Sequence, residues 1–196
     1  MSTERHKRAD STSRKRQQGF ALLEVLISIV VLTIGMVSLL SLFAVAIAST
    51  QDANEDMLAR QEAVEALESI YTARNTSQIT FAQIQNTPNG VFLPGLQPNN
   101  DAGPDGLDGT ADDLNGNTAN PYCPGPAKCV ELPGTDGILG TSDDQWLPLN
   151  NYQRSITITP LNPNLSQITV TVQYTTSQFK EMTKTYSVGG LISSYR

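Results

Sequence analysis

Residues 14–24 read Arg-Lys-Arg-Gln-Gln-Gly-Phe-Ala-Leu-Leu-Glu, and the stretch that follows, from Val25 to Gln51, contains no charged residue. Glu24 is therefore a lone carboxylate at the entrance of an apolar segment. A charged side chain inside a bilayer costs about 2.5–3.5 kcal/mol on insertion scales, so a chain that keeps one there usually uses it. The junction predicts a membrane-length helix with a functional carboxylate near its start.

The apolar run Val25–Ala48 contains no Pro and makes a helix roughly 36 Å long, which spans a hydrocarbon core of about 30 Å. A cleaved secretory signal peptide is the alternative, because Ala46-Ile47-Ala48 is similar to a small-residue cleavage site. The apolar region of a signal peptide is typically about 7–15 residues long, and this run is nearly twice that length. We therefore favour a spanning helix.

Basic residues concentrate ahead of the apolar segment. Residues 1–19 hold six Lys and Arg against two acidic residues, and the remainder holds seven against 17. This excess of positive charge keeps the N-terminus in the cytoplasm and places the acidic remainder outside. The net charge of −6 conceals the division. Because the basic residues serve topology, no nucleic-acid surface is predicted.

Gly19-Phe20-Ala21-Leu22-Leu23-Glu24-Val25-Leu26-Ile27 resembles the processing site of type IV prepilins and type II secretion pseudopilins. The shared features are a basic leader, then Gly, Phe, an apolar stretch and a Glu at one spacing. In that family a prepilin peptidase cuts after the Gly, here Gly19, and the new N-terminal residue, here Phe20, is methylated on its amine. The sequence of this junction is most similar to those of PilV-type minor pilins and of the I-type minor pseudopilin.

The resemblance implies partners and a location. The partners are the prepilin peptidase, other pilins, an inner-membrane assembly platform and the inner membrane itself. The location is the inner membrane, as a single-pass protein with a cytoplasmic N-terminus, and then the pilus, periplasm or cell surface. It also implies a subunit that is not an enzyme and requires no cofactor.

A pairing role for Glu24 follows from physical chemistry. The new amine of Phe20 lies about one helical turn from Glu24. An unpaired carboxylate is strongly disfavoured in a bilayer or filament core, and an amine from a neighbouring subunit would satisfy it. Such a pair sets the register between subunits. The alternative is that Glu24 snorkels to the head groups from the helix end.

The remainder predicts an α+β head in which the long N-terminal helix packs on a C-terminal antiparallel sheet. Residues 51–74 lack Gly and Pro, and we expect their buried stripe to be Met57, Val64, Leu67 and Tyr71, with Glu55, Glu62, Glu65 and Glu68 mostly elsewhere. A short coiled coil is the alternative. We expect the helix to end at residues 75–77.

Strands are predicted where Ile156 and Ile158 alternate with Thr, across 168–175, and from Met182 to Val188. Breaks at 160–164 and 176–180 make these an antiparallel meander with one buried face. The expected division is a leader, 1–19, an assembly helix, 20–50, and a head, 51–196. The head includes a Gly/Asp/Pro-rich insert without periodicity, 87–150.

The insert repeats the pattern Asp-Gly-x-x-Gly-Thr-x-Asp-Asp, at residues 105–113 and 136–144. Clustered Asp side chains with Gly between them suit calcium, which takes about 6–8 oxygen ligands. The candidate ligands are Asp105, Asp108, Asp112, Asp113, Asp136, Asp143 and Asp144. Because Leu139 replaces Asp108, we expect the second copy to be the weaker site, unless both copies share one ion. Plain Asp-Gly turns are the alternative.

Cys123 and Cys129 lie between the copies, and an even pair in an exported domain predicts a disulfide. Two thiols without a His outside the leader do not complete a zinc site, and the single His, His6, is in the leader. No nucleophilic triad or phosphate loop appears, so no enzyme is predicted.

The predicted function is therefore a minor pilin-like subunit of a type IV pilus. The alternatives are a minor pseudopilin of a type II secretion system and a membrane-anchored calcium-binding or adhesive surface module.

Overall fold

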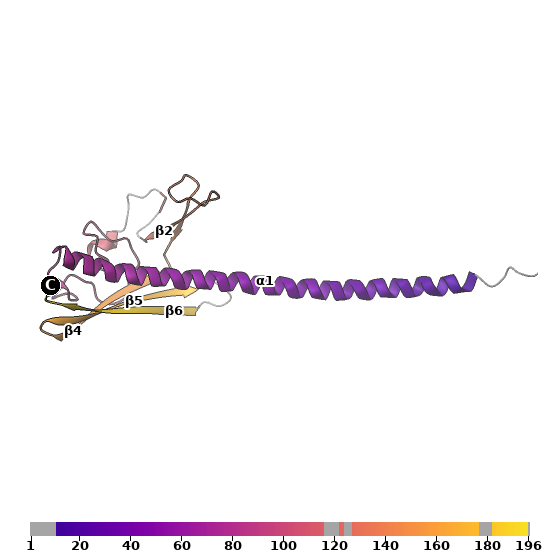
Figure 1. Cartoon of the computed structure of the whole chain (residues 1–196), viewed down its shortest axis with the longest axis horizontal. Helices are drawn as coiled ribbons and strands as arrows, with labels where there is room; N and C mark the ends of the chain where they lie inside the picture. The colour runs from indigo at the N-terminus through magenta and orange to yellow at the C-terminus, as the bar shows by residue number, and fades with distance from the viewer. Residues whose placement is uncertain (1–10, 116–121, 124–126, 177–181, 196) are drawn as a thin grey trace, which may run out of the picture. The chain divides into compact units, whose positions relative to one another are not determined.

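The computed structural model describes residues 11–115, 122–123, 127–176 and 182–195, and it divides the chain into two compact units, Met1–Thr50 and Gln51–Arg196. One helix, α1 (Ser11–Asn75), contributes its first part to the first unit and its last part to the second (Figure 1). Its C-terminus falls in the range predicted from the sequence.

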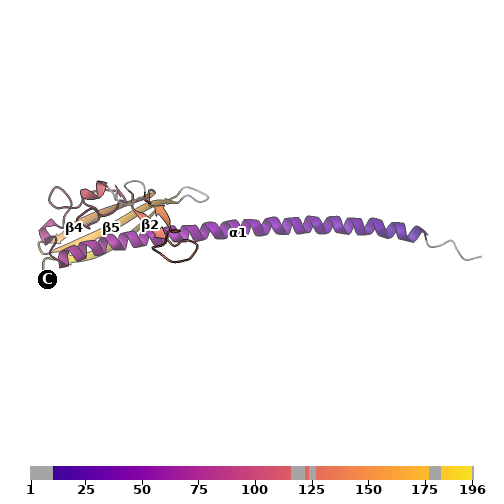
Figure 2. The ribbon, with the colours of Figure 1, turned by 90° about the horizontal axis from the view of Figure 1, so that it is seen from above.

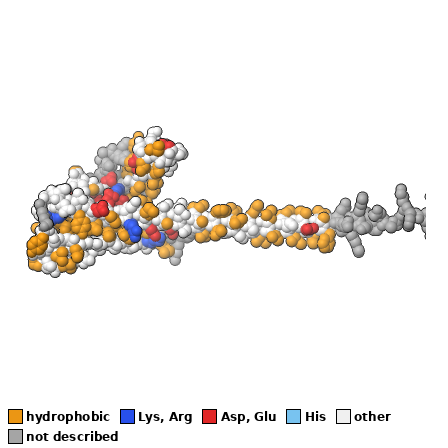
Figure 3. Space-filling model, viewed as in Figure 1, with side chains coloured by type: hydrophobic (Ala, Val, Ile, Leu, Met, Phe, Trp, Pro, Cys, Tyr) orange, Lys and Arg blue, Asp and Glu red, His pale blue; other side chains and the backbone are white. Residues whose placement is uncertain are grey.

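The first unit consists, in its described part, of residues 11–50 of α1, which are apolar from Phe20 onward apart from Glu24 and a few small polar residues. Every large hydrophobic side chain from Phe20 to Ile47 is exposed, between 49% and 75%, and hydrophobic side chains recur along the whole visible face of the segment (Figure 3). The hydroxyls of Ser28, Thr33 and Ser38 donate hydrogen bonds to backbone carbonyls three or four residues earlier, at 2.7–2.9 Å. By length and composition this helix is able to cross a membrane. It confirms the helix predicted over Val25–Ala48.

The second unit contains a four-stranded antiparallel sheet in the order β1-β4-β5-β6. The strands are β1 (Gln97–Pro98), β4 (Tyr152–Asn162), β5 (Leu165–Thr176) and β6 (Met182–Ser193). A separate hairpin pairs β2 (Cys129–Leu132) with β3 (Gln145–Pro148), and two short 3-10 helices lie at Phe81–Gln83 and Asp112–Asn115. The predicted α+β fold and the meander of its last three strands are confirmed. The break predicted at 160–164 is wrong for residues 160–162, which belong to β4, and residues 177–180 of the second predicted break lie outside the described residues.

The last part of α1 packs along one face of the sheet (Figures 1 and 2). Its buried stripe is spaced by four, three, four and three residues and consists mainly of alanine: Ala59, Ala63, Ala66, Ile70 and Ala73. Small side chains let the helix backbone approach the strands closely. The sheet supplies the larger partners, which include Ile156, Ile168, Val170 and Val172.

The stripe predicted from the large side chains of α1 is wrong. Met57 is 58% exposed and the other three predicted residues are only partly buried, whereas Glu62 is 3% exposed. The prediction weighted residue size, but close packing on a β-sheet favours Ala. Glu62 is buried because Lys128, Arg154 and Asn99 surround its carboxylate.

In the part that the structure describes, the insert at residues 87–150 forms regular structure that its composition does not predict. It forms β1, β2 and β3, and Phe92, Leu107 and Leu149 are buried members of the main core. That core begins at Ala59, so it lies entirely within Gln51–Arg196. The head therefore holds a complete hydrophobic core of its own.

Candidate functional site

The processing junction lies in the first unit. Gly19 is inside α1, and Phe20 and Glu24 are both exposed, Phe20 by 75%. Residues four apart in a helix lie on the same face, about one turn from each other. The carboxylate of Glu24 is thus open to a group from outside the chain. Cleavage after Gly19, methylation of Phe20 and the pairing of Glu24 stay predictions.

The two copies of the acidic repeat fold into nearly identical loops, here called loop 1 (residues 103–113) and loop 2 (residues 134–144). In loop 1 the amide of Gly109 donates to Asp113 Oδ2 at 2.6 Å, and in loop 2 the amide of Gly140 donates to Asp144 Oδ2 at 2.6 Å. The threonine hydroxyl donates to the first carboxylate of the Asp-Asp pair in each loop, at 2.5 and 2.7 Å. The two copies therefore share a pattern of hydrogen bonds as well as a sequence pattern.

The second glycine of each repeat lies four residues before the second Asp of the Asp-Asp pair, and its backbone conformation explains why a glycine is needed there. Gly109 and Gly140 have φ values of +83° and +85°, in the left-handed region that residues with a Cβ rarely adopt. This backbone conformation lets the amide of each glycine point at the second carboxylate of the Asp-Asp pair.

Each loop gathers its own group of carboxylates. Asp105, Asp112 and Asp113 each offer an oxygen within 4.8 Å of the others, and Asp136, Asp143 and Asp144 do the same. Two separate groups form, one in each copy. Carboxylate oxygens are the ligands that calcium prefers, so these six residues are the ones that could hold an ion.

Hydrogen bonds keep part of each group ionised. Thr141 and Thr135 donate to Asp143 and lower the pKa of that carboxyl to about 2. Thr110 lowers the pKa of Asp112 in the same way, whereas burial raises the pKa of Asp113. Asp112 and Asp143 therefore remain negatively charged at neutral pH.

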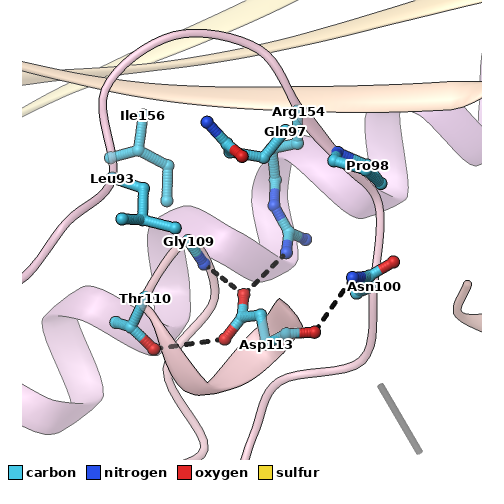
Figure 4. Close-up of a pocket in the computed structure, with 9 residues that line it drawn as sticks. All are labelled: Leu93, Gln97, Pro98, Asn100, Gly109, Thr110, Asp113, Arg154 and Ile156. Carbon is cyan, nitrogen blue, oxygen red and sulfur yellow. Dashed lines mark hydrogen bonds and ion pairs between the residues drawn. The ribbon is translucent and has the colours of Figure 1, made fainter. Parts of the chain in front are cut away.

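The seventh predicted ligand, Asp108, lies outside the loop 1 group. Its carboxylate forms an ion pair with Arg154, with Oδ1 and Nη2 2.8 Å apart, and both side chains are 3% exposed. Arg154 Nη2 also lies 3.7 Å from Asp113 Oδ2 (Figure 4). Its Nη1 lies 3.9 Å from Glu62 Oε2. Burial raises the pKa of Asp108 even though Arg154 opposes the shift. Asp108 therefore ties loop 1 to the core.

Sequence reasoning missed this buried polar network, which joins Glu62, Asn99, Lys128 and Arg154 to the carboxylates of Asp108 and Asp113. One signal was present. Arg154 occupies an inward position in the alternation Tyr152, Arg154, Ile156, Ile158, and all four residues are buried. An arginine on the core face of a strand requires buried acidic partners.

The predicted disulfide is confirmed. Cys123 and Cys129 are bonded, with their Cα atoms 5.9 Å apart, and Cys129 is the first residue of β2. The bridge therefore fixes the base of the hairpin that carries loop 2.

The family model of the prokaryotic N-terminal methylation motif matches residues 14–40. The N-terminus of this chain is type IV prepilin-like. The motif implies processing by a prepilin peptidase and pilus-type assembly, and subunits that carry it are typically structural and not enzymatic. No curated protein and no solved structure matches the chain.

Proposed function

We propose that this chain is a minor pilin-like subunit of a type IV pilus, anchored in the inner membrane before assembly. The observation that carries the proposal is the methylation motif at residues 14–40 on a helix whose apolar side chains are 49–75% exposed. Such a surface is stable only in a bilayer or against other apolar helices. Membrane anchoring and helix-to-helix assembly both provide that environment.

Assembly depends on the pair formed by Phe20 and Glu24. Cleavage after Gly19 gives Phe20 a cationic amine, and the amine of one subunit pairs with Glu24 of the next. Removal of one partner leaves the other charge unpaired in an apolar medium. Glu24→Ala is therefore inserted and processed but incorporated poorly, whereas Glu68→Ala, at an exposed position of the same helix, is incorporated normally.

The test compares sheared surface filaments with membranes from cells that express each variant. A large loss of Glu24→Ala from the filament fraction, with normal amounts in the membrane, supports the proposal. Equal incorporation of both variants contradicts the pairing role. The same fractions from cells without the pilus assembly platform decide between the two filament systems. If the protein still leaves the membrane there, but is retained in cells without the secretion platform, it is a minor pseudopilin.

We also propose that loops 1 and 2 each bind one calcium ion, as in a calcium-dependent surface module. The supporting observation is that the same three carboxylates converge within 4.8 Å in both copies. Because Asp108 faces Arg154 and lies outside its group, Leu139 removes no ligand from loop 2. We therefore expect loop 2 to bind at least as well as loop 1, the reverse of the order expected from the sequence.

Trp146, the only tryptophan, reports on loop 2 because it lies in β3, two residues after Asp144. Calcium should change its fluorescence at concentrations of about 10⁻⁴–10⁻³ M, the range of extracellular modules. Asp143→Asn should abolish the response, and Asp112→Asn in loop 1 should preserve it. An unchanged spectrum with millimolar calcium, or an undiminished response in Asp143→Asn, leaves the loops as plain turns.

A further inference from the structure

Three side chains converge on one buried carboxylate oxygen in the head. Glu62 Oε2 accepts a hydrogen bond from Asn99 Nδ2 at 2.9 Å. The same oxygen forms an ion pair with Lys128 Nζ at 3.1 Å. Glu62 and Asn99 are 3% and 1% exposed, and the Lys128 side chain is 15% exposed. An amine, a carboxamide and a carboxylate are thus held together with little access to water.

The fold fixes this arrangement from three separate elements. Glu62 is on α1, Asn99 directly follows β1, and Lys128 directly precedes β2. The two loop segments are joined by a β-bridge between Asn100 and Ala127, and the amide of Lys128 donates to the carbonyl of Asn99 at 2.9 Å. The Lys and Asn backbones are therefore neighbours, and both side chains turn to the same oxygen of Glu62.

We propose that Lys128 and Asn99 react to form an isopeptide bond, with Glu62 as the catalytic acid and base. Glu62 accepts a proton from the Lys128 ammonium, and the free amine attacks Cγ of Asn99. The bond from Nζ to Cγ forms, and the bond from Cγ to Nδ2 breaks. Protons passed through Glu62 reach the leaving nitrogen, which departs as ammonium. Nothing is oxidised or reduced, and no co-reactant is required.

The surroundings suit proton transfer through Glu62. A single oxygen contacts both the attacking and the leaving nitrogen at hydrogen-bond distance, the geometry that general acid–base catalysis requires. Burial lowers the pKa of Lys128, but the nearby carboxylates of Glu62 and Glu65 outweigh burial and raise it above its ordinary value. The proton on Lys128 is therefore the one that Glu62 must take first.

Two buried atoms beside Glu62 lack a hydrogen-bond partner among the described residues. They are Oδ1 of Asn99, where negative charge develops during the attack, and Nη1 of Arg154, which lies 3.9 Å from Glu62 Oε2. Arg154 therefore supplies a buried positive charge beside the carboxylate of Glu62.

The cross-link would close the segment from Asn99 to Lys128, which contains loop 1 and Cys123. Closing a long loop covalently reduces the conformational entropy of the unfolded chain. The base of the insert would then be held by the isopeptide and by the Cys123–Cys129 disulfide together. A subunit pulled within a filament would gain resistance to opening at this point.

Peptide mapping of the full-length wild-type protein provides the test. After reduction, a protease that cuts before aspartate separates Asn99 from Lys128, because five aspartates lie between them: Asp101, Asp105, Asp108, Asp112 and Asp113. We expect the two peptides to be joined, with a mass lower than their sum by one ammonia. Trypsin should also fail to cut after Lys128. Recovery of both peptides separate and unmodified overturns the proposal.

Ammonia is also lost when an Asn-Gly pair such as Asn89-Gly90 forms a succinimide, but that reaction joins no peptides. Lys128→Arg keeps the positive charge and removes the nucleophile, so the joined product should disappear. Glu62→Gln keeps a hydrogen-bonding carbonyl and removes the proton carrier, and it should also be unlinked. A joined product in Glu62→Gln contradicts the catalytic role of Glu62. If either variant fails to fold, the wild-type map alone decides.

Discussion

Loop 1 and loop 2 share a sequence pattern and a backbone geometry but differ in their surroundings. The middle residues of loop 1, Leu107 and Asp108, are each 2% exposed, whereas their counterparts in loop 2, Ile138 and Leu139, are 60% and 58% exposed. Local sequence therefore determines how such a loop folds. The rest of the chain determines whether the middle of the loop packs into the core or is exposed at the surface.

The largest expected effect concerns the residue that binds loop 1 to the core. Arg154→Met leaves Asp108 and Glu62 buried without their cation, and breaking a buried ion pair costs about 3–5 kcal/mol. The free energy of unfolding, measured by denaturant titration of the head, should fall by about that amount. Arg60→Met, at an exposed position of α1, is the control and should change it by less than about 1 kcal/mol.

Comparable losses from Arg154→Met and Arg60→Met would mean that the buried network does not stabilise loop 1. The two loops would then differ only in exposure.

A pair of glycine substitutions should separate the two loops by stability. Gly109→Ala and Gly140→Ala both place a Cβ at positive φ, which costs about 1–2 kcal/mol. In loop 1 the new Cβ also lies 2.6 Å from Cδ1 of the buried Ile156, whereas nothing is within 4 Å in loop 2. Overpacking adds about 1–3 kcal/mol, so Gly109→Ala should be the more destabilising of the two. Thermal melting of both variants measures the difference, and equal shifts would contradict it.

The sequence predicted the loops but not their roles. The repeat, its glycines and its Asp-Asp pairs are local features, and the structure reproduces them in both copies. The role of Asp108 depends on Arg154, which is 46 residues away and pairs with it only after the sheet has formed. The same limit explains the wrong stripe on α1, because the burial of Glu62 depends on partners from three other segments.

The methylation motif at residues 14–40 was predictable from sequence because its residues are contiguous. So was the strand pattern of β4, β5 and β6, where alternation directly reflects one buried face. The strands within the insert could not be predicted from the sequence, because each has only two to four residues, too few to show an alternation of polar and apolar side chains.

A smaller effect concerns pH. The pKa of Asp143 is lowered in the folded state from 3.8 to about 2 by threonine hydroxyls, so its stabilising contribution is present above 3.8 and is lost as the pH falls toward 2. Because Asp143 is exposed, the contribution is small. Asp143→Asn should flatten the dependence of the denaturation midpoint on pH between 3.8 and about 2. A slope equal to that of the wild type would show that these hydrogen bonds do not persist in solution.

Processing as a prepilin is tested most directly by tandem mass spectrometry of the N-terminal peptide of the protein extracted from membranes. We expect a chain that begins at Phe20 with one methyl group on its amine and retains Glu24 as its fifth residue. A chain that still begins with Met1, or one that begins at Ser49 after cleavage as a secretory signal peptide, would contradict this expectation.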